Sequence, residues 1–147
     1  MNQVEKAVKL FEEGYLCSQA ILATYGPEFG ISRETALKLS APFGGGVARM
    51  AETCGAVNGA FMVLGLKYGH TEARDGQTKE KAYAIVKEFV NEFEAKNGTI
   101  TCKELLNCDI SNNDELKRAR EEKLFTTICP KLVKDAAEIL DRILKDK

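Results

Sequence analysis

The spacing of apolar residues along the chain predicts helices almost throughout. Between Asn2 and Glu13 the apolar side chains recur with helical period, and Gly14 is a natural terminator. The strongest amphipathic pattern begins at Pro130, a favoured first helical position, and continues to Leu144. A period-two alternation is nowhere sustained, so the pattern predicts no strand and an all-α fold.

Capping and breaking residues set the limits of the shorter predicted helices. These helices run over Ser18–Tyr25, from a Ser32 cap, over Thr78–Lys96, over Cys102–Leu106 after a Thr101 cap, and from Asp109 or Ser111 to Arg120. A polar loop is expected over residues 71–78. The length of 147 residues fits one domain. We therefore expect a single helical domain over residues 1–147, a bundle of about six or seven helices without a sheet.

The stretch from Arg49 to Gly65 is expected to form one long central helix around which the rest is organised. On such a helix Ala51, Gly55 and Gly59 lie on one face that has almost no side chain. Glycine costs a helix roughly 1 kcal/mol relative to alanine, so these glycines require a packing or functional reason. Taken alone they indicate a tight helix crossing. Beside Cys54 they also indicate a groove where a small molecule approaches the thiol.

A glycine loop, Phe43-Gly44-Gly45-Gly46, precedes this stretch. Backbone amides in such a loop can form an anion-binding concavity, with Arg49 as reinforcement. No strand precedes the loop and no Gly-Lys-Ser/Thr follows, so it is not a nucleotide-binding fingerprint. A flexible turn with a solvated Arg49 explains the loop equally well. The candidate binding residues are Gly44, Gly45, Gly46, Arg49, Gly55, Asn58 and Gly59.

Composition limits the binding partners and the cellular location that we expect for the protein. Hydrophobic residues make up 44% and charged residues 29%, as in an ordinary soluble domain. The formal net charge of -1 gives no basis for binding nucleic acid or an anionic membrane. The N-terminus lacks a basic start followed by an apolar run, and the run near Phe61–Leu66 is too short to span a bilayer. We therefore expect a cytoplasmic protein without membrane insertion; homo-oligomerisation stays open.

The five cysteines carry the chemistry that the sequence offers. In a reducing compartment, cysteines are more often catalytic, metal-bound or inert than permanently bridged. Cys17, Cys102 and Cys129 fall at predicted helix starts, where the positive end of the helix can lower a thiol pKa from about 8.5 by one to several units. Cys54 lies beside the glycine face. Against this, an unpaired cysteine often serves only as a small buried hydrophobe.

The segment Cys54-Gly55-Ala56-Val57-Asn58-Gly59 resembles the CGAxxG core of the C_GCAxxG_C_C family of putative redox-active proteins. Other segments match the family in the same order: residues 14–20, the glycine loop 43–46, residues 101–106, and Cys129-Pro130 followed by 136–140. The resemblance covers most of the chain and implies redox chemistry by Cys17, Cys54, Cys102 and Cys129, without supplying a substrate. Cys108 lies outside the pattern and is expected to be structural or incidental.

The leading hypothesis is a thiol–disulfide redox protein in which two of these four cysteines cycle between dithiol and disulfide. Cys129 or Cys102 is the expected attacking thiol, and Cys54 or Cys17 the resolving one. A redox partner protein or a small thiol would exchange electrons with it, as for a thiol oxidoreductase. The hypothesis requires helices that bring two of the cysteines within about 7 Å at Cα.

Two other hypotheses stay open. In the first, Cys17, Cys54, Cys102 and Cys129 bind zinc or an iron–sulfur cluster, although such sites usually draw ligands from short Cys-x-x-Cys pairs, which this sequence lacks. In the second, the protein is a helical interaction module with inert cysteines.

Overall fold

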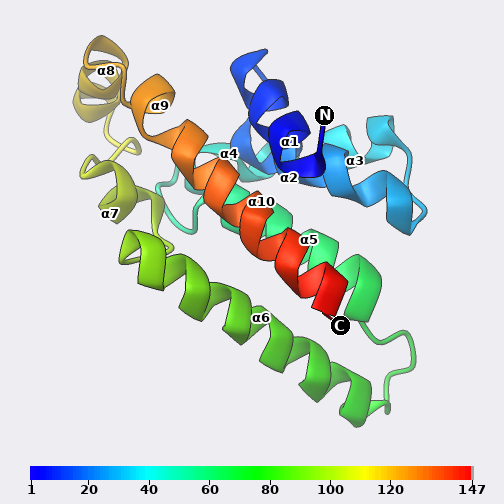
Figure 1. The fold of residues 1–147 in the computed structure, drawn as a ribbon. Coiled ribbons are helices and arrows are strands. Elements are labelled where there is room, and N and C mark those ends of the chain that lie inside the picture. The colour runs from blue at the N-terminus through cyan, green and yellow to red at the C-terminus, as the bar shows by residue number, and fades with distance from the viewer. Residues whose placement is uncertain (147) are drawn as a thin grey trace.

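A computed structural model describes residues 1–146. Within them the fold is all-α, as predicted, with eight helices of five or more residues where six or seven were expected (Figure 1). The helices are α1 Gln3–Glu12, α2 Cys17–Tyr25, α3 Arg33–Ser40, α4 Gly44–Val47, α5 Gly55–Tyr68, α6 Gly76–Asn97, α7 Cys102–Leu106, α8 Asn113–Glu121, α9 Leu124–Thr127 and α10 Cys129–Asp146, with short 3-10 turns at Gly26–Phe29 and Ala41–Phe43. In the same residues no helix is both long and apolar enough to cross a membrane.

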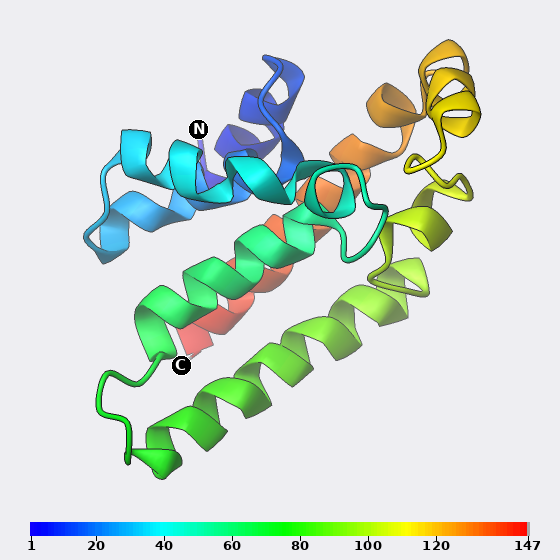
Figure 2. The ribbon, with the colours of Figure 1, turned by 180° about the vertical axis from the view of Figure 1, so that it is seen from behind.

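Helix α5 lies at the centre of the packing. Figure 2 shows it between the N-terminal helices on one side and α6 on the other, with α10 behind it. Its apolar residues are mostly fully buried, and the rings of Phe89 and Phe93 on α6 stack at 6.1 Å in the same core. The amphipathic stripe predicted from Pro130 faces this core, and so do Ile85, Phe89 and Phe93 of α6. The helical period therefore identified the buried face of α10 correctly.

The glycines of α5 allow it to cross α2 closely. A Cβ atom on Gly59 would lie 2.9 Å from the carbonyl oxygen of Ser18 and 3.0 Å from Cβ of Ile21. A Cβ atom on Gly55 would lie 2.9 Å from the carbonyl oxygen of Phe43 and would overlap the sulfur of Cys17. Real Cβ atoms do not approach other atoms so closely, so the tight crossing predicted from the glycines is present.

The expected long helix from Arg49 is wrong at its start. Helix α5 begins at Gly55, and residues 45–49 and 51 have positive φ angles, so the chain there winds in the left-handed sense. Hydrogen bonds of 3.2 Å from the Ala51 N–H to the Gly45 carbonyl and of 2.9 Å from the Glu52 N–H to the Gly46 carbonyl close this turn. Ala51 therefore does not share the glycine face. The apolar pattern carries no information on handedness, and this is why the pattern misled.

Smaller departures concern the second half of the chain. The N-cap of α8 is Asn112, whose side chain accepts from two backbone N–H groups, rather than Asp109 or Ser111. Ser111 instead donates to the Asp109 carboxylate. Thr101 precedes α7 as expected, but its side chain makes no capping hydrogen bond. The short helix α9, which leads directly into α10, was not predicted.

The close crossing predicts opposite effects for two glycine substitutions in α5. Gly59→Ala should lower the free energy of unfolding by about 1–3 kcal/mol, because the new methyl group has no room against α2. Gly65→Ala, where the added Cβ meets nothing within 4 Å, should raise it by about 0.4–1 kcal/mol. Urea denaturation of both variants measures the difference. Equal effects of the two substitutions would contradict the packing argument.

Candidate functional site: a cavity lined by four cysteines

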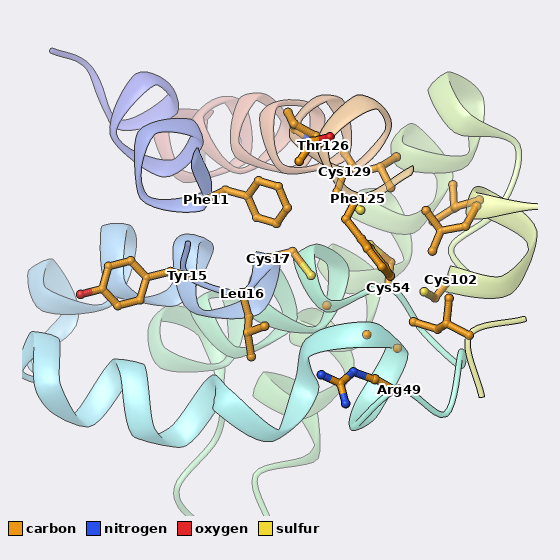
Figure 3. Close-up of a pocket in the computed structure, with 18 of the residues that line it drawn as sticks. Phe11, Tyr15, Leu16, Cys17, Arg49, Cys54, Cys102, Phe125, Thr126 and Cys129 are labelled. Atoms are coloured by element: carbon orange, nitrogen blue, oxygen red, sulfur yellow. The ribbon is translucent and has the colours of Figure 1, made fainter. Parts of the chain in front are cut away.

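Four helices begin at one cavity, and each brings a cysteine to it. Cys17, Cys102 and Cys129 are the first residues of α2, α7 and α10, and Cys54 is the N-cap of α5. All four side chains line a cavity of about 530 Å³ (Figure 3). They are the same four that the family resemblance singled out. All are free thiols, Cys17 and Cys129 half-buried and the other two buried.

Cys108 lies apart from this cavity. It is buried, and its thiol donates to the carbonyl oxygen of Glu115 at 3.2 Å. This hydrogen bond connects the segment before α8 to helix α8, so the contacts of Cys108 are local to this part of the chain.

A pairing of two backbone segments holds the starts of α5 and α7 together. The Cys54 N–H donates to the carbonyl oxygen of Ile100 at 2.8 Å, and the Cys102 N–H donates to that of Glu52 at 2.6 Å. One isolated antiparallel bridge lies between these bonds. Residues 48 positions apart in sequence thereby share one wall of the cavity.

The sulfur of Cys17 is surrounded by hydrogen-bond donors. The Cys54 thiol donates to it, and so do the backbone N–H groups of Gly45, Ser18 and Ala56. These bonds stabilise the thiolate and lower the pKa of Cys17 to about 7, although burial acts in the opposite direction. At neutral pH a large fraction of Cys17 is therefore ionised.

The same contact has the reverse effect on Cys54. Its thiol donates to Cys17, and this bond, together with burial and the negative charge on Cys17, raises the pKa of Cys54 well above its ordinary range. Hydrogen bonds from the backbone of Ala56 and Val57 oppose the shift without cancelling it. When the pair carries a single negative charge, that charge therefore lies on Cys17 and the remaining proton on Cys54.

The lowering expected for the other two helix-start cysteines is wrong. Burial raises the pKa of Cys102 and of Cys129 to about 12, and the negative charge of Cys17 adds to both shifts. Helix α7 has only five residues, and its first N–H group is already bonded to Glu52. Helix α10 follows α9 after the single residue Ile128, so its start is not a free helix end. Both thiols are neutral at physiological pH.

The candidate binding residues of the glycine loop divide into two groups. Gly45, Gly46, Arg49 and Gly55 line the cavity. The other three do not line it: Gly44 packs against Leu16, the Asn58 side chain donates to the Thr53 carbonyl at 3.1 Å, and Gly59 contacts α2.

One amide of the glycine loop, that of Gly45, is directed toward Cys17. The Gly45 N–H donates to Cys17, and the N–H groups of Ala51 and Glu52 donate to carbonyl oxygens of the loop itself. A Cβ on Gly46, at a φ of +67°, would lie 2.7 Å from Cβ of Cys102. The negative group that this loop contacts is therefore the thiolate of Cys17.

Several lining residues were missed by sequence reasoning. Phe11, Tyr15 and Phe125 provide apolar walls, and Arg120 lines the cavity as well. In Figure 3, Cys17, Cys54 and Cys102 lie between Phe11, Phe125 and Thr126 on one side and Arg49 on the other. Arg120 ends a predicted helix, and nothing in a helix of mixed charges indicates which of its cations approaches a cavity.

The four thiols do not have the arrangement of a metal site. Over residues 1–146, no three His, Cys, Asp or Glu side chains are placed to hold a metal ion. The four cysteines come from four separate helix starts.

Fold and site define an all-α protein with a cluster of cysteine thiols around one cavity. Residues 15–143 match the sequence profile of the family described as "Putative redox-active protein (C_GCAxxG_C_C)". The chain belongs to this family, and the resemblance found in the sequence is confirmed. No curated protein and no solved structure matches the chain significantly.

The opposite pKa shifts of Cys17 and Cys54 predict how the reactivity of Cys17 depends on pH. Alkylation by iodoacetamide requires the thiolate, so the rate at Cys17 should rise with pH around a midpoint of about 7. Cys54→Ala removes a donor and should move this midpoint upward, whereas Cys54→Ser keeps a donor and should move it less. Mass spectrometry of peptides after timed alkylation gives the rates. A midpoint that is the same in all three proteins would contradict the assignment.

Proposed function

We propose that this protein is a thiol–disulfide oxidoreductase in which Cys17 attacks and Cys54 resolves. The observation that carries the proposal is the close approach of the two thiols where α2 meets α5 at Gly55, which lowers the pKa of Cys17 and raises that of Cys54. Only the thiolate is a strong nucleophile toward a disulfide, and the optimum attacking thiol has a pKa near the ambient pH. Cys17 meets both conditions, and Cys102 and Cys129 meet neither.

The reaction proceeds in two exchange steps. The Cys17 thiolate attacks one sulfur of a disulfide RS–SR, forming a mixed disulfide and releasing RS⁻. Cys54 then loses its proton and attacks the Cys17 sulfur, forming the Cys17–Cys54 disulfide and releasing the second RS⁻. One of the two leaving thiolates takes up the proton of Cys54. Two electrons pass from the protein to the substrate; a dithiol donor restores the reduced pair by the reverse exchange.

The order of the two steps follows from the electrostatics of the pair. While Cys17 is a thiolate, its charge and its hydrogen bond hold the proton on Cys54. Formation of the mixed disulfide removes that charge. The amide donors of Ala56 and Val57, which favour the Cys54 thiolate, are then opposed only by burial. Attack by Cys17 thus activates Cys54 for the second step.

This assignment reverses the roles expected from the sequence. Cys129 and Cys102 were the expected attacking thiols because of their place at helix starts. Their raised pKa values favour neutral thiols that line the cavity beside the reactive pair. We place the reaction in the cytoplasm, where permanent disulfides are rare, with a redox partner protein or a small thiol as the exchange partner.

Oxidation should consume two thiols per chain and leave one mapped disulfide, between Cys17 and Cys54. Cys17→Ser should abolish this loss, because Cys54 then has no partner sulfur and the thiols of Cys102 and Cys129 are neutral at pH 7, whereas Cys108→Ser should leave it unchanged. Thiol titration before and after treatment with a small disulfide, followed by peptide mapping, measures both. A disulfide that joins Cys102 to Cys129 in the wild-type protein, with Cys17 still free, would overturn the proposal.

A further inference from the structure

Two arginines line the cysteine cavity without any partner of their own. Arg49 and Arg120 are exposed, and within residues 1–146 neither forms an ion pair or a side-chain hydrogen bond. The other arginines near packed elements are engaged: Arg33 lies over the ring of Tyr15, and Arg118 and Arg142 pair with glutamates. Two unengaged guanidinium groups at one cavity are available for a ligand.

Arg49 and the Cys17 sulfur both neighbour the same residue of the glycine turn, Gly45. A Cβ atom on Gly45 would lie 3.0 Å from Cγ of Arg49, so the stem of the arginine covers this glycine. The N–H group of the same glycine donates to the Cys17 sulfur. The left-handed turn therefore holds the guanidinium stem and the thiolate on adjoining parts of one wall.

The rest of the lining limits what can enter. Leu16, Phe11 and Phe125 make the walls largely apolar, and the cavity volume of about 530 Å³ is that of a small-molecule site. Among the described residues that line the cavity, Glu12 is the one carboxylate. The cavity thus suits a molecule with a short apolar part around its reactive atoms and negative charge at its ends.

We infer that the exchange partner of this site is a low-molecular-weight disulfide that carries carboxylates; the inference rests on the proposed function. The disulfide enters the apolar part of the cavity, where Cys17 attacks one sulfur and releases the other half as a thiolate. Arg49 and Arg120 bind the carboxylates and offset their repulsion by the Cys17 thiolate. The second exchange by Cys54 releases the remaining half, so that one disulfide yields two carboxylate-bearing thiols.

Three small disulfides of similar size and different charge test this inference. They are 3,3'-dithiodipropionate, which is dianionic, bis(2-hydroxyethyl) disulfide, which is neutral, and cystamine, which is dicationic. The rate of Cys17–Cys54 disulfide formation is measured with each probe, in the full chain and in Arg49→Gln, Arg120→Gln and the double variant. Arg74→Gln is the matched control, since Arg74 is also exposed and unpaired but lies away from the cavity.

The expected result is a dianion-to-neutral rate ratio that falls about three- to tenfold in the double variant, because an exposed charge pair contributes at most about 1 kcal/mol. Taking this ratio within each protein cancels differences in Cys17 reactivity between the proteins, and comparing the ratios between proteins cancels the intrinsic reactivities of the probes. The ratio should also fall with added salt and stay constant in Arg74→Gln. A ratio insensitive to both arginines overturns the inference while leaving the proposed function intact. Failure of all three probes to oxidise the pair overturns the proposed function itself.

Discussion

The contact between the sulfurs of Cys17 and Cys54 is the interaction on which the site depends. It exists because α2 and α5 approach each other at Gly55, where any side chain would overlap the Cys17 sulfur. Packing and chemistry therefore meet at one residue. The glycine that permits the helix crossing also provides the space in which the Cys17 sulfur lies, and the Ala56 N–H that follows it on α5 stabilises the negative charge.

The left-handed turn over residues 45–51 also contributes to the environment of the Cys17 sulfur. Val47, Ala48 and Arg49 all have positive φ angles, a conformation that costs a non-glycine residue roughly 1–2 kcal/mol. The turn directs the Gly45 N–H to Cys17, places Gly46 against Cys102 and presents Arg49 to the cavity. Such strain persists where the surrounding structure enforces it, and it concentrates at functional sites. Here the enforcing contacts are the hydrogen bonds that close the turn and the bridge to the start of α7.

The sequence predicted the helices and the four cysteines, but not the order of their acidities. Helical period and capping residues located α1, α2, α3, α6, α7 and α10, because these signals are local. The cysteine pattern identified the side chains that the structure brings to one cavity. The handedness of residues 45–51 and the approach of Arg120 were not accessible, since each depends on contacts between segments distant in sequence.

The raised pKa values of Cys102 and Cys129 show which physical effect decides in such a cavity. A helix start stabilises a nearby negative charge by about 0.3–1 kcal/mol, which is less than one pKa unit. Burial can shift a pKa by up to about 3–5 units in the opposite direction. Cys102 and Cys129 have the helix start without further donors, so burial prevails and their pKa values rise. Cys17 has one thiol and three amide donors from three different segments, and their sum exceeds the cost of burial. The most acidic cysteine of this cluster is therefore the one with the most converging donors, and its place at a helix end is of lesser weight.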